Sequence, residues 1–221
     1  MKTPNAEELF DLTHTLAAPL LSATPFPYTV LTGLGSFLRA LGESLPKEEY
    51  EEVREGVWIA RGVSVAPTAQ IEGPTVVGKG AQIRAGAYLR GSVLVGENAV
   101  VGNSCELKNA VLFDCAQVPH FNYVGDSILG YRAHLGAGVI LSNVRLDKRT
   151  VSIKTEDGRL DTGLKKFGAL VGDYSEIGSK SVLNPGSLVG RRALVYPLSS
   201  VIGVVNEDTV YPSNAKWRGS V

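Results

Sequence analysis

Branched aliphatic residues recur at every sixth position through much of this chain. The series runs without exception from Ile59 to Leu107 and returns between Val171 and Val201. Small side chains, such as Ala81, stand four residues after most of these aliphatic anchors. A period of six is neither the roughly 3.6 of an α-helix nor the 2 of an isolated strand, so the chain must turn a corner once in each hexad.

Three hexads of this kind close a triangular coil, and the next coil then stacks about 4.8 Å away from it. The aliphatic anchors of successive coils would form buried ladders. Glycines follow several anchors directly, where we expect positive φ angles to help the chain bend. These glycines are Gly78, Gly96, Gly102, Gly172, Gly178 and Gly190. The pattern predicts a mainly β protein with a parallel β-helix over residues 58–205.

The six-residue pattern is interrupted at several places. One anchor, Leu107, is followed after five residues by Leu112, and Val124 is followed in the same way by Leu129. A longer excursion spans residues 145–168 and holds seven Lys or Arg against four Asp or Glu residues. Its Asp-Gly pair within residues 155–158 predicts a protruding β-hairpin. Such an excursion is either a solvated loop or, because loops on rigid scaffolds carry binding groups, part of a site.

Residues 1–57 lack the repeat and are expected to form a helical cap or linker. An amphipathic helix is predicted over residues 7–21, with Asn5 and Glu8 as its capping box. A second helix is predicted over residues 28–45, interrupted by two glycines, and an acidic turn or linker over residues 46–55. We expect these helices to cap the open end of the solenoid. Residues 206–221 are expected to form a C-terminal tail.

Composition limits the classes of function. The chain has 22 basic and 22 acidic side chains among 221 residues, which argues against nucleic acid as a partner. We find no apolar run long enough to span a membrane and no signal-peptide pattern at the N-terminus, and therefore expect a cytoplasmic protein. Cys105 and Cys115 are too few for a disulfide framework, and packing is their expected role.

Two cations are expected to stack on the surface of the coil. Arg90 and Lys108 each follow an anchor and lie 18 residues apart, which is one regular coil. Like charges at this spacing, about 4.8 Å, repel each other unless an anion lies close to them. The two side chains are therefore either solvated surface cations or part of a phosphate site.

Histidine is scarce in this chain and occurs only as His14, His120 and His134. His120 lies beside a proline, in a departure from the hexads. A neutral imidazole can take a proton from an ammonium group near neutral pH. Glu106, about one coil below, could orient the ring of His120. A lone histidine is more often structural than catalytic, so both readings stay open.

The motifs at residues 101–108, 119–126, 135–138 and 142–143 resemble a known family. They are similar to the acetyltransferase domain of bifunctional glucosamine-1-phosphate acetyltransferase / N-acetylglucosamine-1-phosphate uridylyltransferase. The resemblance covers about residues 58–205. It implies a left-handed coil, against the usual preference for right-handed crossovers. It also implies a homotrimer with active sites in the clefts between neighbouring coils.

The resemblance also assigns roles to single residues. His120 would be the general base on the sugar amine, and Glu106 would orient it. Other residues would bind the substrates: Arg90, Lys108 and Lys166 the sugar phosphate, Tyr123 and Asn143 the sugar, and Ala137 and Ser179 the acetyl-coenzyme A path. The reaction implied is acetyl transfer from acetyl-coenzyme A, as co-substrate, to an amino-sugar 1-phosphate, with no metal and no covalent enzyme intermediate.

The chain departs from the family at three places. His134 stands where the family has an asparagine that contacts the substrates, so it is a further candidate for substrate binding and could alter substrate choice. Pro197 replaces a small residue near coenzyme A, and the excursion at residues 145–168 is longer than in the bacterial pattern. Some stand-alone relatives have a similar loop, with cations near the position of Arg149.

Two further observations bear on the class of function. Residues 1–57 are too few to hold a uridylyltransferase domain, so we expect no nucleotidyl transfer. The alternative to an enzyme is a binding or scaffold protein that retains a relic of the site. A zinc carbonic anhydrase of similar fold would need three histidine ligands, and only His120 and His134 lie on the repeat.

Overall fold

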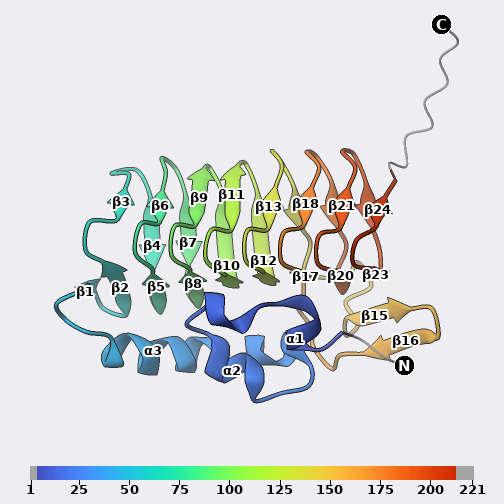
Figure 1. Cartoon of the computed structure of the whole chain (residues 1–221), viewed down its shortest axis with the longest axis horizontal. Helices are drawn as coiled ribbons and strands as arrows, with labels where there is room; N and C mark the ends of the chain where they lie inside the picture. The colour runs from blue at the N-terminus through green and yellow to red at the C-terminus, as the bar shows by residue number, and fades with distance from the viewer. Residues whose placement is uncertain (1–3, 213–221) are drawn as a thin grey trace, which may run out of the picture.

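The protein is a triangular solenoid with three flat faces, as the computed structural model of residues 4–212 shows (Figure 1). Each face is a stack of short parallel strands, and each coil adds one strand to every face. We name the faces A, B and C in the order in which the chain passes through them. The predicted parallel β-helix is therefore confirmed.

Face A consists of β2 (Val57–Ala60), β5 (Thr75–Val77), β8 (Val93–Val95), the second halves of β10 (Glu106–Leu112) and β12 (Tyr123–Leu129), β17 (Ala169–Val171), β20 (Ser187–Val189) and β23 (Val204–Val205). Face B consists of β3 (Ser64–Val65), β6 (Gln82–Ile83), β9 (Val100–Asn103), β11 (Gln117–His120), β13 (His134–Leu135), β18 (Glu176–Ile177), β21 (Leu194–Val195) and β24 (Val210–Tyr211). Face C consists of β4 (Gln70–Glu72), β7 (Tyr88–Arg90), the first halves of β10 and β12, β14 (Ile140–Leu141), β19 (Val182–Leu183) and β22 (Ser200–Val201).

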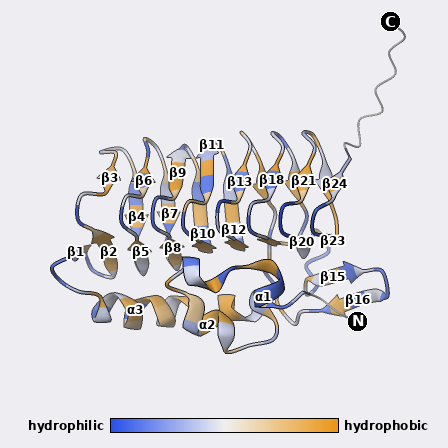
Figure 2. Ribbon diagram, in the orientation of Figure 1, coloured by the Kyte–Doolittle hydropathy of each residue, from blue (hydrophilic) through white to orange (hydrophobic). Residues whose placement is uncertain are grey.

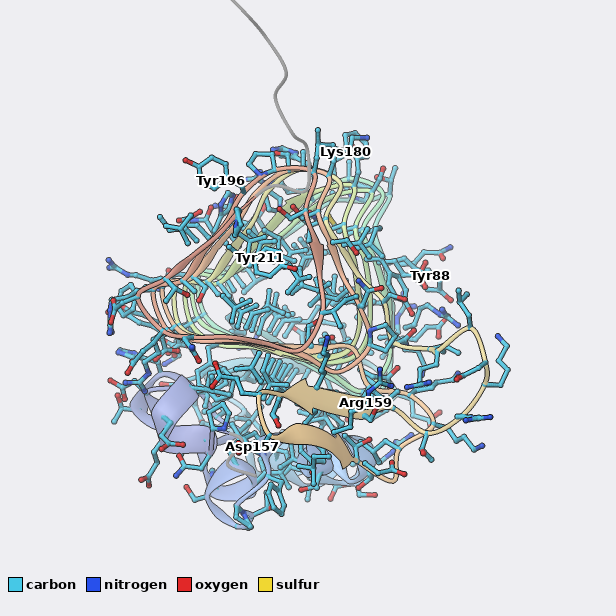
Figure 3. The ribbon with its side chains drawn as sticks, turned by 90° about the vertical axis from the view of Figure 1, so that its right-hand side faces the viewer. Tyr88, Asp157, Arg159, Lys180, Tyr196 and Tyr211 are labelled. Carbon is cyan, nitrogen blue, oxygen red and sulfur yellow. The ribbon has the colours of Figure 1, made fainter. Side chains whose placement is uncertain are left out.

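The handedness of the coil can be followed in Figure 3, which looks along the solenoid from its C-terminal end. Tyr196 marks the end of a face B strand, Lys180 lies at the top edge, and Tyr88 lies on face C. The chain therefore runs clockwise while it advances toward the viewer. A coil of this sense is left-handed, as the resemblance implies. We call the edge between faces B and C the apex.

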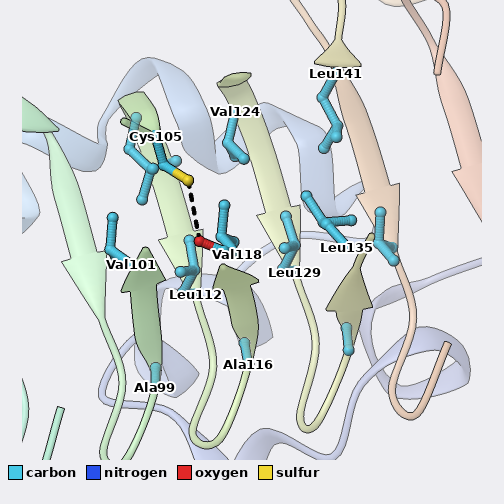
Figure 4. Packing of buried hydrophobic residues seen from close by; sticks show 14 of the residues in the cluster. Ala99, Val101, Cys105, Leu112, Ala116, Val118, Val124, Leu129, Leu135 and Leu141 are labelled. Atoms are coloured by element: carbon cyan, nitrogen blue, oxygen red, sulfur yellow. Dashed lines mark hydrogen bonds between the residues drawn. The ribbon is translucent and has the colours of Figure 1, made fainter. Parts of the chain in front are cut away.

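The register explains why the slips in the sequence are tolerated. Val77 pairs with Val95, 18 residues on, whereas Leu107 pairs with Val124 and Leu112 with Leu129, each 17 residues on. Shortening a coil by one residue keeps every anchor on its ladder because the loss falls in a corner. The interior is thus a continuous apolar core, in which Val101, Val118 and Leu135 follow one another (Figure 4).

The glycines that follow the anchors do not have the conformation that we expected. None of the six has a positive φ, and the corners with positive φ are mostly occupied by other residues, for example Asn98 and Phe121. Their role is close approach between coils. A Cβ atom on Gly102 would lie 1.6 Å from the carbonyl oxygen of Pro119, and one on Gly178 would lie 2.4 Å from the backbone nitrogen of Pro197. Glycine is therefore required there by the backbone of the next coil.

The N-terminal segment lies along face A and does not cap the end of the solenoid (Figure 1). Its helices are α1 (Ala6–Leu9), η1 (Leu12–His14), α2 (Ala18–Ser22), η2 (Pro27–Thr32) and α3 (Leu34–Ser44). Apolar side chains on the outside of face A, such as Leu94 and Ile128, pack with these helices in a second core. Figure 2 shows the apolar residues of α3 along this contact. Because these outward side chains are apolar, covering a lateral face removes more apolar surface from water than capping one end would.

The predicted helix over residues 7–21 is broken in the structure, although its capping box at Asn5 and Glu8 is present. The chain between α1 and α2 follows the edge of the solenoid instead. There the backbone nitrogen of Asp11 donates to the Asp173 carboxylate, and the backbone nitrogen of Asp114 donates to the carbonyl oxygen of His14. These bonds to the coils replace the intrahelical bonds that a continuous helix would make.

The excursion forms the predicted hairpin, with β15 (Ser152–Thr155) antiparallel to β16 (Gly158–Asp161) and a turn at Glu156 and Asp157. The hairpin packs beside β20 and β23 at the C-terminal end of face A (Figures 1 and 3). Gly186, at a corner with a positive φ, makes this approach possible, because a Cβ atom there would lie 2.6 Å from the carbonyl oxygen of Ser152.

The boundaries of the solenoid differ from those we expected. The segment preceding it includes a strand, β1 (Tyr50–Arg54), which pairs antiparallel with β2. At the other end β24 pairs with β21, so the solenoid continues into the residues expected to form a tail. The remainder of that tail, residues 213–221, lies outside the described residues.

A charge placed in the interior ladder should prevent folding. Val95 is fully buried between Val77 and Leu112. We expect Val95→Asp to cost several kcal/mol, because an unpaired carboxylate would be buried, and to yield insoluble or unfolded protein. Solubility and circular dichroism measure the effect. The control is Val53→Asp on β1, where the side chain is 50% exposed. A soluble, native-like Val95→Asp variant would contradict the inward placement.

Candidate active site

His120 lies at the apex, at the end of β11 and just before the corner that leads to face C. The corner is held by Asn122, which is buried. Its side-chain oxygen accepts a hydrogen bond of 3.0 Å from the backbone nitrogen of His120, and its amide nitrogen donates to the carbonyl oxygen of Gly136 at 2.8 Å. The backbone of His120 is therefore fixed, while its side chain is exposed. Among residues 4–212 the imidazole has no hydrogen-bond partner.

The residues expected to line the acetyl-coenzyme A path follow His120 along the apex. The backbone nitrogen of Gly138 donates to the carbonyl oxygen of His120 at 2.9 Å, and that of Lys180 donates to the carbonyl oxygen of Ala137 at 2.9 Å. Ser179 therefore lies one coil beyond Ala137, on the same edge of the solenoid. The structure brings these three predicted residues, His120, Ala137 and Ser179, into one row.

A polar cluster occupies the neighbouring surface of face C. The side-chain nitrogen of Asn143 donates to the Tyr123 hydroxyl at 3.2 Å and to the carboxylate of Asp126. Asn109 donates to the other carboxylate oxygen of Asp126 at 2.8 Å. Burial raises the pKa of the Tyr123 phenol, so this hydroxyl stays protonated at neutral pH and can donate to a ligand.

Gly125 makes room for this cluster. A Cβ atom at this position would lie 2.5 Å from the Tyr123 hydroxyl oxygen and 2.6 Å from the side-chain nitrogen of Asn143. The absence of a side chain at Gly125 thus lets the two polar groups meet above the strand. This accounts for the Tyr-x-Gly-Asp order in the sequence, in which Asp126 anchors the cluster from below.

The two predicted cations lie on the same face, and each has a carboxylate beside it. Leu89 pairs with Leu107, which places Arg90 and Lys108 opposite each other in neighbouring strands. One guanidinium nitrogen of Arg90 donates to Glu106 at 2.6 Å, and the ammonium of Lys108 lies 3.8 Å from Asp126. The anions that offset the repulsion between the cations therefore come from the chain itself.

Glu106 does not orient His120 within one chain. In the register, Glu106 stands opposite Tyr123, whereas His120 stands opposite Asn103 on the other side of the apex. The chain turns the corner between them, and Arg90 holds the Glu106 carboxylate on face C. No hydrogen bond joins Glu106 and His120 among the described residues, so the expected orientation of the ring is absent from the isolated chain.

The cation expected from the excursion, Lys166, lies next to the cluster along the chain. The following residue, Phe167, is buried, and its backbone nitrogen donates to the carbonyl oxygen of Asn143 at 3.0 Å. This bond holds the return of the excursion against face C. Lys166 itself is exposed. Its position is therefore compatible with the predicted role on an anion, and the role stays a prediction.

His134 lies on face B and is apart from the face C cluster. Its ring nitrogen Nδ1 is 2.7 Å from a carboxylate oxygen of Glu176. The sequence analysis did not identify Glu176, because the two residues are 42 positions apart and meet only through the excursion. The sequence analysis also missed Asn122 and assigned no role to Asp126. An asparagine in the middle of a buried, apolar corner was the available signal for the first of these.

The residues described by the structure were also searched for metal ligands and membrane spans. Residues 4–212 contain no group of three or more His, Cys, Asp and Glu side chains that could hold a metal ion. None of the helices in this range is long and apolar enough to cross a membrane.

Substitution of Gly125 tests the geometry of the cluster. We expect Gly125→Ala to displace Tyr123 and Asn143 and to lower the free energy of unfolding by about 1–3 kcal/mol, the usual cost of overpacking. Urea unfolding measures the difference. Gly33→Ala is the control, since the nearest atom to a Cβ there is 4.0 Å away. Equal stability of the two variants would contradict the described packing of the cluster.

Comparison with known proteins extends these observations. Residues 71–161 match the family described as the GMPPB C-terminal domain. A bifunctional sugar-1-phosphate nucleotidylyltransferase/acetyltransferase of Sulfurisphaera tokodaii is 33% identical over 108 residues, which are 49% of this chain and 26% of that protein. The bifunctional protein GlmU of Methanococcus maripaludis is 33% identical over 93 residues, 42% of this chain and 22% of that protein. The resemblance inferred from the motifs is thus confirmed, while the chain spans about a quarter of the length of these two relatives.

Solved structures show weaker similarity. The acetyltransferase domain of PglB from Neisseria gonorrhoeae is 19% identical with a TM-score of 0.37, over 86% of this chain and 65% of that one. The UDP-N-acetylglucosamine acyltransferase of Francisella novicida is 15% identical with a TM-score of 0.41, over 71% of this chain and 64% of that one. At these scores the likeness says nothing about what this chain binds.

Proposed function

We propose that this protein is an N-acetyltransferase that moves the acetyl group of acetyl-coenzyme A to the amine of an amino-sugar 1-phosphate similar to glucosamine 1-phosphate. The observation that carries the proposal is the exposed imidazole of His120 at the apex, in one row with Ala137 and Ser179. The printed names of the relatives include acetyltransferases of sugar 1-phosphates, which agrees with this chemistry.

In the proposed reaction, the free imidazole of His120 takes a proton from the ammonium group of the sugar. The amine nitrogen then attacks the thioester carbon, and a tetrahedral intermediate forms. Collapse of the intermediate forms the amide and breaks the carbon–sulfur bond, and the nitrogen gives up its second proton as coenzyme A leaves as the thiol. Residues that hold the sugar phosphate contribute by keeping the amine in line with the thioester.

The arrangement of the candidate residues favours a homotrimer. The sugar and phosphate residues lie on face C, whereas His120 and the predicted acetyl-coenzyme A residues lie at the apex and His134 lies on face B. One chain therefore presents these groups in two directions. A neighbouring copy whose face B approached face C of the first would bring both groups to one cleft. Face A is already covered by the helices and the hairpin, which leaves faces B and C for such contacts.

The charges on face C set a condition on phosphate binding. Arg90 is bound to Glu106 in the unliganded chain, so a sugar phosphate has to compete with this carboxylate for the guanidinium. Lys108 is farther from its carboxylate, at 3.8 Å, and its ammonium is freer to turn to a ligand. Lys108 should therefore contribute more of the phosphate affinity than Arg90.

The same ion pairs favour one alternative, a binding or scaffold protein without catalysis. A chain whose cations are satisfied by Glu106 and Asp126 can keep this surface without any ligand. The two functions differ in turnover, since the alternative predicts no release of coenzyme A with any amino sugar.

Removal of the proposed base gives the first test. We expect His120→Ala to lower the rate of acetyl transfer by about 100-fold or more, because a positioned general base contributes on that scale. Release of the coenzyme A thiol measures the rate across a panel of amino-sugar 1-phosphates. Analytical ultracentrifugation checks that the assembly is unchanged, and His14→Ala controls for the loss of a histidine elsewhere. No transfer by the wild-type protein to any member of the panel would favour the scaffold.

Neutralising Lys108 gives a second test of the proposed function. We expect Lys108→Gln to raise the KM for the sugar phosphate by about tenfold, the effect of losing one hydrogen bond to a charged group, with a smaller change for acetyl-coenzyme A. Steady-state kinetics at constant ionic strength measure both values. Arg192→Gln is the control, since Arg192 pairs with Asp208 at another edge of the solenoid. An unchanged KM in Lys108→Gln would remove this residue from the phosphate site.

A further inference from the structure

His134 is the imidazole that the structure holds in a defined state. Its Nδ1 lies 2.7 Å from the carboxylate of Glu176, and the two residues stand opposite each other in β13 and β18. An ionised carboxylate only accepts hydrogen bonds, so Nδ1 must carry the hydrogen. In the neutral ring Nε2 is then an acceptor. This nitrogen has no hydrogen-bond partner among residues 4–212, and the ring is partly exposed.

The surface between His134 and the apex is bare backbone. The register places the outward positions of successive coils there in one row, which contains Gly102, Pro119, Gly136 and Gly178. The next coil excludes side chains at the glycines, since a Cβ atom on Gly136 would lie 2.6 Å from the backbone nitrogen of Ser179. His134 borders this strip on one side, and His120 and Ala137 border it on the other. A small polar molecule lying on the strip can therefore meet both imidazoles.

We propose that His134, fixed in one tautomer by Glu176, accepts a hydrogen bond from a hydroxyl or amino group of the acceptor molecule and so determines which acceptor binds. The inference rests on the proposed function, because it places the acceptor on face B next to His120. It assigns proton transfer to His120 and recognition to His134. Glu176 acts through His134 as a positioning residue.

A purely structural role makes a different prediction. Opposed charges on neighbouring strands stabilise a sheet, and a His–Glu pair can act in this way without touching any ligand. Removing either partner would then change stability and leave the affinity for the acceptor unaltered. Affinity and stability therefore have to be measured on the same variants.

The test uses the full chain and glucosamine 1-phosphate as the probe, with binding measured by calorimetry and turnover by thiol release. We expect His134→Ala to weaken binding of the probe and raise its KM by about tenfold, the effect of one lost hydrogen bond, with kcat within about twofold. Glu176→Ala should have a smaller effect of the same kind, because the ring remains but its tautomer is no longer fixed. His134→Asn should restore part of the affinity, since its amide oxygen can accept.

Arg192→Ala is the matched control, because it removes a cross-coil ion pair to Asp208 at 2.6 Å on another edge. Affinity unchanged in His134→Ala, with a loss of stability similar to that of Arg192→Ala, would overturn the inference and leave a structural pair. A loss confined to kcat would also overturn it. Wild-type protein that binds the probe without turnover, with binding weakened in His134→Ala, would refute the proposed reaction while the recognition role stands. Wild-type protein that does not bind the probe would refute both.

Discussion

The stacking of each coil directly on the next is the constraint on which the rest of this structure depends. Backbone hydrogen bonds join successive strands on three faces, and each aliphatic anchor packs on the anchor before and after it. A residue can then be lost from a corner, as between Leu107 and Val124, without disturbing either system. Side chains at equivalent positions are brought within one strand spacing, about 4.8 Å, of each other. This spacing produces the Arg90–Glu106 and His134–Glu176 contacts.

The same constraint explains which features the sequence predicted and which it did not. The hexads predicted the solenoid because each anchor reports a local requirement, an apolar side chain facing the interior. The glycines were misinterpreted because their reason is not local: Gly102 is needed for the carbonyl group of Pro119 in the next coil. The helix over residues 7–21 was wrong for a similar reason, since Asp114 and Asp173 bind the backbone of that segment.

The candidate site follows this division. Stacking of Arg90 with Lys108 could be predicted from an interval of one coil, and the structure has that register. The partner of Glu106 could not, because its side chain could turn toward either edge and the corner separates it from His120. Glu176 could not be paired with His134 before the excursion was known to leave the stack and return to it. Charge partners across a long insertion are therefore the least predictable part of a solenoid site.

The asymmetry of the three faces links fold and function. Face A carries outward apolar residues such as Leu94 and Ile128, and the N-terminal helices and the hairpin cover them. Faces B and C keep polar outward positions, and every candidate site residue of the solenoid lies on them or at the apex between them. A single triangular coil cannot direct two adjacent faces at one small molecule, because they diverge from their shared edge. Chemistry that needs both the His120 row and the Arg90 cluster therefore requires a second copy of the chain, and the covered face limits how that copy can approach.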